Sequence, residues 1–267
     1  MEDRLIAVQS RAEHCPPPNA SVHIDPDRRA GSPKRARSVA DYAPALPFLQ
    51  GLIDPGIGAA IKLSPASDFD DHFGRSDVEI EVISLGGECK EATVWGGPLK
   101  TCRRRATCLP AGASWTDRDG PTHSTLPIAG PLPWLLEPDP ALIRSGLLDG
   151  FAAVHGLSRL APGMDVLVGN EVVESPFLTP FALQEVLPLD RKRLIRYVAE
   201  QGLGPLEIKT RALDLTPEQA RSWLKPPGPN PATLWLIGGR GKALALVARR
   251  PSWPLEIRGK DGERSIN

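Results

Sequence analysis

The chain has 267 residues, enough for two domains of ordinary size, and its 41% of hydrophobic residues can give each domain a core. The formal net charge is zero, no apolar run approaches the roughly 20 residues of a membrane span, and four cysteines without a CxxC pair argue against a zinc site or a disulfide framework. With no signal sequence at the N-terminus, these features exclude a membrane-spanning or disulfide-stabilised protein and favour a reducing, cytoplasmic location.

The first predicted strand, residues 22–24, ends in Asp25-Pro26, because proline fixes φ and cannot donate to a strand ladder. The elements predicted after it are, in order, a helix over 42–53, strands over 56–63 and 78–85, a segment of helical character over 88–95, and a strand over 104–109. This is the order of the second half of a parallel sheet whose last strands can turn antiparallel. Such a half-sheet would leave a bare hydrophobic edge along the first strand.

The second part of the chain begins with residues 110–131, whose Pro, Gly and Thr content predicts a linker. We then expect a strand over 132–136, a helix from Asp139-Pro140 to about 155, and a strand over 165–168. The elements predicted next are a strand over 181–187, a helix over 191–201, a strand over 206–209, a helix over 217–224, and a hairpin of 233–237 with 242–247. This βαβαββ order predicts a ferredoxin-like α+β module, a common platform for RNA.

Several segments occur together in one order: HIDPDRRA, AAIKLSP, EVISLGGECKEATVW, RRATCLP, LLEPDPALIRSGL and a C-terminal module with an excess of basic residues. Together they resemble bacterial class I S-adenosylmethionine-dependent methyltransferases with a C-terminal THUMP-like domain. The resemblance covers about residues 20–250 and is most specific in the DPDRR and GGECKEA runs.

The fold implied by this resemblance is α/β plus α+β: the C-terminal half of a Rossmann-like methyltransferase sheet, followed by a ferredoxin-like, THUMP-like module. The domains expected are an unplaced segment (1–20), a partial Rossmann-like domain (21–112), a linker (113–131), a small ferredoxin-like segment (132–178), a THUMP-like domain (179–250) and a tail (251–267).

The resemblance places Asp25 and Pro26 where amino-group methyltransferases of this class carry an Asn/Asp-Pro-Pro-aromatic loop, with Arg28 and Arg29 at its rim. A carboxylate or backbone carbonyl there can hold the hydrogens of an exocyclic amine and aim its lone pair at a methyl sulfonium, without covalent catalysis. The sequence has Asp27 where an aromatic residue would stack on a base, so base methylation has less support than the fold. A solvated turn after an edge strand is the simpler alternative.

Other side chains can reach the same carboxyl edge of the predicted sheet. Lys62 and Ser64 end the second strand, and Glu88 and Lys90 follow a Gly-Gly pair; we take all four as candidate substrate contacts. The alternatives are a cap on the strand end and a solvated helix start with an internal ion pair. Cys89 has no histidine partner in the sequence, so it is not expected to be a nucleophile.

The basic residues of the C-terminal module form the best candidate RNA-binding surface: Arg191, Lys192, Arg193, Arg196, Lys209 and Arg211. A charge run on a helix is more often only a solvated face. The resemblance to THUMP-like domains is what favours contact with RNA.

The cofactor implied by the resemblance is S-adenosylmethionine, and no metal is expected. Related enzymes bind it on a first strand and a glycine-rich turn, and the 21 residues before Val22 leave no room for these elements. The glycines at 238–241 lie between two apolar strands and predict a hairpin turn instead. We therefore expect a truncated or split enzyme, inactive alone, whose missing strands a separate chain could supply, and which methylates an amino group in RNA. The alternative is a non-catalytic RNA-binding or partner-docking protein.

Overall fold

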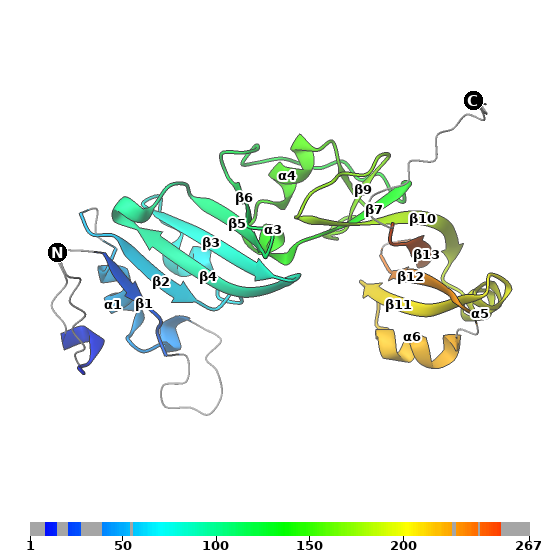
Figure 1. Cartoon of the computed structure of the whole chain (residues 1–267), viewed down its shortest axis with the longest axis horizontal. Coiled ribbons are helices and arrows are strands. Elements are labelled where there is room, and N and C mark those ends of the chain that lie inside the picture. Colours follow the sequence, from blue (N-terminus) through cyan, green and yellow to red (C-terminus); the bar gives the residue numbers. More distant parts are fainter. Residues whose placement is uncertain are drawn as a thin grey trace, which may run out of the picture. The chain divides into compact units, whose positions relative to one another are not determined.

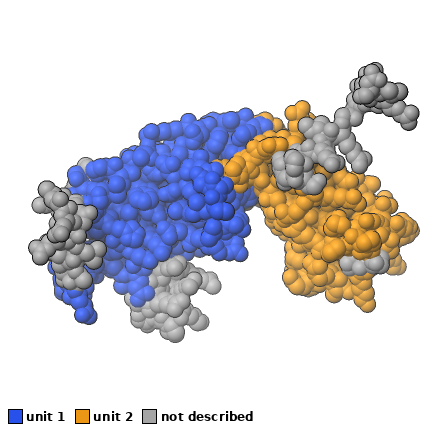
Figure 2. All heavy atoms as spheres, in the orientation of Figure 1, with its two compact units in different colours: residues 1–125, 138–155 blue, residues 126–137, 156–267 orange. Residues whose placement is uncertain are grey.

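The computed structural model describes residues 9–14, 21–27, 39–53, 56–225, 228–239 and 241–251. Two compact units divide the chain: residues 1–125 with 138–155 form unit 1, and residues 126–137 with 156–267 form unit 2 (Figure 2). Each unit contains its own mixed sheet (Figure 1). Two candidate substrate contacts, Arg28 and Arg29, lie outside the described residues.

Unit 1 is built around a six-stranded sheet in the order β1-β2-β4-β3-β5-β6. Strand β1 is parallel to β2, β4 is antiparallel to both β2 and β3, β3 is parallel to β5, and β6 is antiparallel to β5. Its elements are η1 (Ala12–His14), β1 (Val22–Ile24), η2 (Val39–Asp41), α1 (Leu46–Gly51), β2 (Ala59–Leu63), α2 (Phe69–Phe73), β3 (Val78–Leu85), β4 (Glu88–Gly96), η3 (Gly97–Leu99), β5 (Arg104–Leu109), β6 (Ala113–Thr116), α3 (Pro140–Arg144) and α4 (Leu148–Val154).

The two faces of this sheet differ in chemistry. One face is apolar: Ile61, Ile80, Val82 and Val94 are almost fully buried, and α3 packs against β3, β4 and β5. Because successive side chains of a strand point to opposite faces, the residues between them form a second, polar face. This polar face carries Lys62, Glu79, Glu81, Thr93, Trp95, Arg105 and Thr107.

Residues 88–95 were expected to have helical character, and that expectation is wrong. They form strand β4, whose Glu91 lies opposite Ile83 of β3. The reason is the turn before them: Gly86 and Gly87 have φ of 61° and 82°, which only glycine adopts readily, and they join β3 and β4 as a two-residue hairpin.

The predicted helix from Pro140 to about 155 is two helices, α3 and α4. Asp139 caps α3 as predicted, because its Oδ1 accepts a hydrogen bond of 2.8 Å from the backbone N–H of Ala141. The helix then ends near Gly146, whose φ of 76° is left-handed.

The structure also differs from the expected domain division between residues 113 and 178. Strand β6 lies inside the expected linker, because residues 113–116 pair with β5. Helices α3 and α4 belong to unit 1, since their buried apolar side chains pack there, whereas β7 and β9 join the sheet of unit 2.

Unit 2 contains a seven-stranded sheet in the order β11-β12-β13-β10-β7-β9-β8. The predicted βαβαββ order is present from β10 to β13, with β11 parallel to β12 and β13 antiparallel to β12 and β10. The expected ferredoxin-like module is wrong, because that motif has the order βαββαβ, whereas here both helices precede the last two strands. Its elements are β7 (Trp134–Pro138), β8 (Ser158–Arg159), β9 (Leu167–Gly169), β10 (Leu178–Pro188), α5 (Arg191–Glu200), β11 (Leu203–Arg211), α6 (Pro217–Leu224), β12 (Asn230–Ile237) and β13 (Leu244–Arg249).

Each face of the unit 2 sheet has its own apolar cluster. Leu194 and Val198 of α5 pack with Leu234 and Leu236 of β12 on one face. Trp235 packs with Phe181 on the other, their rings in an edge contact with centroids 5.3 Å apart. Across the described ranges, no helix combines the length and the apolar character needed to cross a membrane.

Candidate functional site

Asp25 lies at the carboxyl end of β1, as the sequence predicts, and its side chain is exposed. The residues around it are anchored: Pro26 is buried, and Asp27 exchanges two backbone hydrogen bonds with Ala43, of 2.7 and 3.0 Å. The corner therefore presents an exposed carboxylate from a fixed backbone, which is the arrangement needed to orient a small polar group.

Asp25 meets Lys62 across the parallel β1–β2 pair. The Lys62 ammonium lies 3.0 Å from Asp25 Oδ2 and 3.6 Å from an oxygen of Glu91 on β4. The hydrogen bond to Asp25 and its negative charge raise the pKa of Lys62 above its ordinary value, so Lys62 stays charged at neutral pH. The structure thus brings together two of the candidate residues, and it adds Glu91 as a third member.

Glu91 was missed from the sequence because residues 88–95 were taken as helical. A strand after the Gly-Gly turn puts Glu91 and Thr93 on the same face as Lys62, since Thr93 is the register partner of Lys62. The alternation Glu91-Ala92-Thr93-Val94 was the signal that could have located it.

Ser64 stabilises the turn after β2 through two hydrogen bonds. Its hydroxyl accepts a hydrogen bond of 3.3 Å from the N–H of Ala66, and its own N–H lies 3.4 Å from the hydroxyl of buried Tyr42. The geometry matches the alternative of a cap on the strand end, and a substrate contact for Ser64 stays a prediction.

Glu88 and Lys90 form an ion pair with one another at the start of β4, where both are exposed. None of their contacts in the described residues joins them to Asp25 or Lys62. Between them, burial raises the pKa of Cys89 to about 11, so its thiol is protonated at neutral pH and is not an activated nucleophile.

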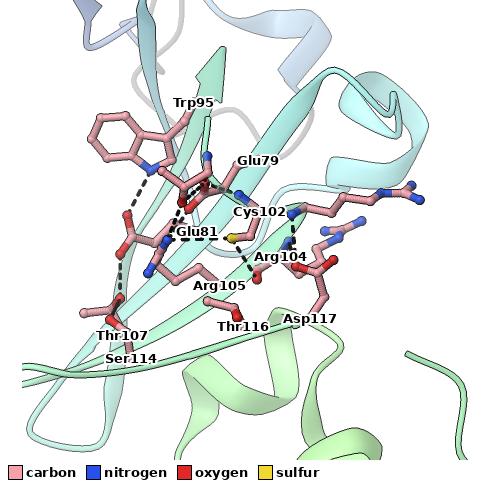
Figure 3. Close-up of polar contacts among 12 residues, drawn as sticks. Glu79, Glu81, Trp95, Cys102, Arg104, Arg105, Thr107, Ser114, Thr116 and Asp117 are labelled. Carbon is pink, nitrogen blue, oxygen red and sulfur yellow. Dashed lines mark hydrogen bonds and ion pairs between the residues drawn. The ribbon is translucent and has the colours of Figure 1, made fainter. Parts of the chain in front are cut away.

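The polar face of the sheet contains one almost fully buried carboxylate, Glu79 (Figure 3). Its Oε1 accepts a hydrogen bond of 2.7 Å from Arg105 Nε, and its Oε2 accepts from Thr101 N, Thr101 Oγ1 and Cys102 N at 2.7–3.0 Å. Burial alone would raise the pKa of Glu79, but these hydrogen bonds outweigh it and hold that pKa below its ordinary value. Glu79 is therefore an ionised structural anchor between β3, β5 and the segment before β5.

A second carboxylate extends this network along β3. Glu81 accepts a hydrogen bond of 2.9 Å from the indole N–H of Trp95 and one of 2.5 Å from the hydroxyl of Thr107, whose Oγ1 lies 3.0 Å from that of Ser114 (Figure 3). The polar face is thus a set of hydrogen bonds that joins four strands.

The six candidate RNA-binding residues do not form one surface. Arg191, Lys192, Arg193 and Arg196 are exposed on α5, but Lys209 and Arg211 project from the other face of the sheet, where each lies over the ring of Trp235 at 5.4 Å. Both are ion-paired there: Glu137 lies 2.8 Å from Lys209 and 3.0 Å from Arg211, and Glu207 lies 3.1 Å from Lys209. The prediction grouped them wrongly because residues far apart in sequence can lie on either face of a sheet.

Comparisons with known proteins assign similarity to both units. Residues 178–250 match a family model described as THUMP domain-like. Two curated proteins from Mycobacterium tuberculosis, of the CDC 1551 / Oshkosh and ATCC 25618 / H37Rv strains, are both named uncharacterized S-adenosylmethionine-dependent methyltransferases. Each is 35% identical to this chain over 218 residues, which is 80% of this chain and 58% of the relative.

A crystal structure of a candidate methyltransferase from Porphyromonas gingivalis W83 has a TM-score of 0.69 and 24% identity, and covers 88% of this chain and 60% of that one. At this identity the likeness shows the fold alone. The chain is therefore similar to S-adenosylmethionine-dependent methyltransferases and carries a THUMP-like C-terminal part. The chain spans only 58% of the length of the curated relatives, so the activity of the whole relatives is a proposal for this chain.

The absence of a cofactor-binding half stays a prediction, and the alignment of 80% of this chain lends it no support. Within the described ranges, however, no glycine-rich turn leads from a strand into an α-helix, and Gly96-Gly97 leads from β4 only into the three-residue 3-10 helix η3. Gly86-Gly87 joins two antiparallel strands, and Gly238-Gly239 lies between β12 and β13. The described residues therefore do not offer the usual fit for a nucleoside cofactor, and no contacts with one are assigned.

Proposed function

We propose that this chain forms the substrate side of an S-adenosylmethionine-dependent methyltransferase that acts on an amino group in RNA. The observation that carries the proposal is the acidic corner at the end of β1. It stands at the carboxyl end of β1 in a chain 35% identical to proteins named uncharacterized S-adenosylmethionine-dependent methyltransferases. The order β1-β2-β4-β3, with β4 antiparallel to its neighbours, fits the C-terminal half of a Rossmann-like methyltransferase sheet.

The role of Asp25 would be to position the acceptor amine. Its carboxylate and the backbone carbonyls of the corner can accept the amine hydrogens and aim the lone pair at the methyl group that is to be transferred. S-adenosylmethionine, when bound, supplies an electrophilic methyl group. Asp25 Oδ1 has no partner within the described residues and is open to such a hydrogen bond.

Lys62 would hold Asp25 in place until substrate arrives. The two side chains are 33% and 54% exposed, and ion pairs at such exposure typically contribute less than about 1 kcal/mol. An amine can therefore replace Lys62 at Asp25 at little cost, while Glu91 keeps a second carboxylate near the displaced ammonium.

The THUMP-like residues would bind the RNA. The supporting observation is the exposed basic side of α5, where four cations face solvent and the only carboxylate paired with them among the described residues is Glu200, 3.8 Å from Arg196. Phosphate contacts of this kind position an RNA without reading its sequence.

Titration calorimetry with S-adenosylmethionine tests whether cofactor binding needs residues beyond this chain. We expect the isolated 267-residue chain to bind the cofactor weakly or not at all. Micromolar binding by the isolated chain would contradict this expectation and would place the cofactor site within these residues.

The second candidate function is a non-catalytic RNA-binding or partner-docking protein. The favouring observation is the outer edge of β1, with which no strand of the described residues pairs. Retained RNA binding without methyl transfer, in the longest polypeptide that the gene encodes, would favour this second function over the first.

A further inference from the structure

Unit 1 contains a pocket of about 410 Å³ that is distinct from the corner formed by Asp25 and Pro26 (the acceptor corner). It lies between β5, β6, the loop after β6 and the α3–α4 pair, and its lining includes Arg103, Arg104, Trp115 and Arg144. Its volume is within the range of small-molecule sites. Asp25 and Lys62 are not among the lining residues, so the pocket is a separate feature of the molecule.

The frame of the pocket is closely packed. A Cβ on Gly150 of α4 would lie 2.5 Å from the carbonyl oxygen of Pro121, and a Cβ on Gly120 would lie 2.9 Å from the carbonyl oxygen of Gly150. Asp119 fixes the start of the loop by accepting hydrogen bonds of 2.7 Å from both the N–H and the hydroxyl of Thr116. The pocket is therefore preformed, which lowers the entropy cost of filling it.

The charge of the lining is positive. Arg104 is ion-paired with Asp70, and the other carboxylate, Asp117, accepts hydrogen bonds of 3.0 and 3.1 Å from the backbone N–H groups of Arg103 and Arg104 (Figure 3). Among the residues that the structure describes, Arg144 donates only to the carbonyl oxygens of Pro65 and Ser67, both at 2.9 Å.

Two guanidinium groups are thus left without a carboxylate. Within the described residues, neither Arg103 nor Arg144 has an acidic side chain at ion-pair distance, although both line the same pocket. Arg144 is also held over the ring of Phe69, 5.3 Å from its centroid, so its position is fixed before a ligand arrives. Guanidinium groups so placed suit a phosphate, which accepts paired hydrogen bonds from them.

The pocket also presents an aromatic ring. Trp115 of β6 makes an edge contact of 4.9 Å with Phe151 of α4, and that contact fixes the orientation of its indole. A flat heterocycle can stack on such a ring with a contribution of roughly 1–3 kcal/mol per base. Phosphate donors and an aromatic ring in one pocket are the features that a nucleotide requires.

We infer that this pocket binds a nucleoside monophosphate unit, with its phosphate at Arg103 and Arg144 and its base against Trp115. The unit could be a free mononucleotide or one nucleotide of an RNA strand, because both have the same phosphate and base. The inference does not depend on methyl transfer or on the acceptor corner.

Titration calorimetry of the full chain with adenosine 5′-monophosphate, a single-stranded RNA tetranucleotide and inorganic phosphate tests the inference. The key variant is Arg103→Ala, since this side chain has no partner within the described residues and its removal spares the fold. Its matched control is Arg118→Ala, which removes an exposed arginine of the loop after β6 that does not line the pocket.

We expect at least one of the two nucleotide probes to bind, at least tenfold more weakly to Arg103→Ala and unchanged to Arg118→Ala. Binding of the mononucleotide identifies a free ligand, and binding of the tetranucleotide alone identifies an RNA strand. Trp115→Leu should weaken nucleotide binding without changing the binding of inorganic phosphate. No binding of either nucleotide, or equal binding by Arg103→Ala and the parent chain, would overturn the inference. Inorganic phosphate binding as tightly as the nucleotides would overturn the role of Trp115.

Discussion

At the scale of single residues, burial separates the carboxylates of unit 1 into two kinds. Glu79 is almost fully buried, ionised and bound by four donors, whereas Asp25 is exposed and held by one partly buried lysine. If the buried Glu79 lost its donors, its negative charge would be left without compensation inside the protein. The exposed Asp25 can change its hydrogen-bond partner because water solvates its charge meanwhile. Asp25 is for this reason the better candidate for contact with substrate.

Glu79→Gln should destabilise unit 1 by about 2–3 kcal/mol, because the new amide would face Arg105 and leave its charge unpaired. Urea unfolding measures the change, and Glu88→Gln is the control, since Glu88 is 73% exposed and pairs only with exposed Lys90. The pKa of Glu79 is lowered by folding, so its stabilisation is full above the unfolded pKa and is lost as pH falls through the folded value. Below about pH 4.5, the free energy of unfolding of the parent chain should therefore fall more steeply with pH than that of Glu79→Gln. The same pH dependence in both proteins would contradict the role of Glu79 as an ionised anchor.

The sequence could locate Asp25 and Lys62 because both follow from strand ends, which apolar runs and a proline mark clearly. It could not pair Lys209 and Arg211 with Glu137, since a contact between residues more than 70 positions apart depends on the order of strands in the sheet. It also could not place Glu91 until residues 88–95 were recognised as a strand.

At the scale of elements, the Gly86-Gly87 turn contributes to the position of Glu91 beside Lys62. It makes β4 the antiparallel neighbour of β3, and the pairing of β4 with β2 on its other side brings Glu91 to Lys62. The elements with strong local signals were predicted well, including the Asp139 cap and the βαβαββ order of unit 2. Strand β6 was not, because a four-residue strand in a polar stretch has little periodicity to detect.

Gly87→Ala should destabilise the chain by roughly 1–2 kcal/mol, because a residue with a Cβ is strained at a φ of 82°. A Cβ there would meet no atom within 4 Å, so the effect would be conformational and not a clash. Gly51→Ala is the matched control: it also meets nothing within 4 Å but has no left-handed φ, and its midpoint in thermal unfolding should stay unchanged or rise. Equal effects of the two substitutions would exclude a strained turn.

At the scale of the whole molecule, the two units have different tasks in the proposed function. Unit 1 would position the acceptor group and the THUMP-like part of unit 2 would bind the RNA backbone. RNA affinity and methyl transfer should therefore be separable by substitution.

Replacing the four α5 cations with alanine should weaken binding to structured RNA and lower the slope of log K against log salt by roughly 3–4, because each phosphate contact contributes about 0.7–0.9. Gel shifts at a series of salt concentrations measure this slope. The control removes four cations of unit 1 that are not candidate substrate contacts: Arg11, Arg75, Lys100 and Arg118. An equal loss of slope in both variants would show that RNA binding reflects net charge and not the α5 surface.

The most direct test of the acceptor corner is the rate of methyl transfer from labelled S-adenosylmethionine to RNA by the longest polypeptide that the gene encodes. Asp25→Ala is compared there with Asp71→Ala, which removes an exposed aspartate of α2. We predict a loss of about 100-fold or more for Asp25→Ala with unchanged RNA affinity, because the amine would no longer be held in line, and no loss for Asp71→Ala. An Asp25→Ala enzyme as fast as the parent would contradict the assignment of this corner as the methyl-acceptor site.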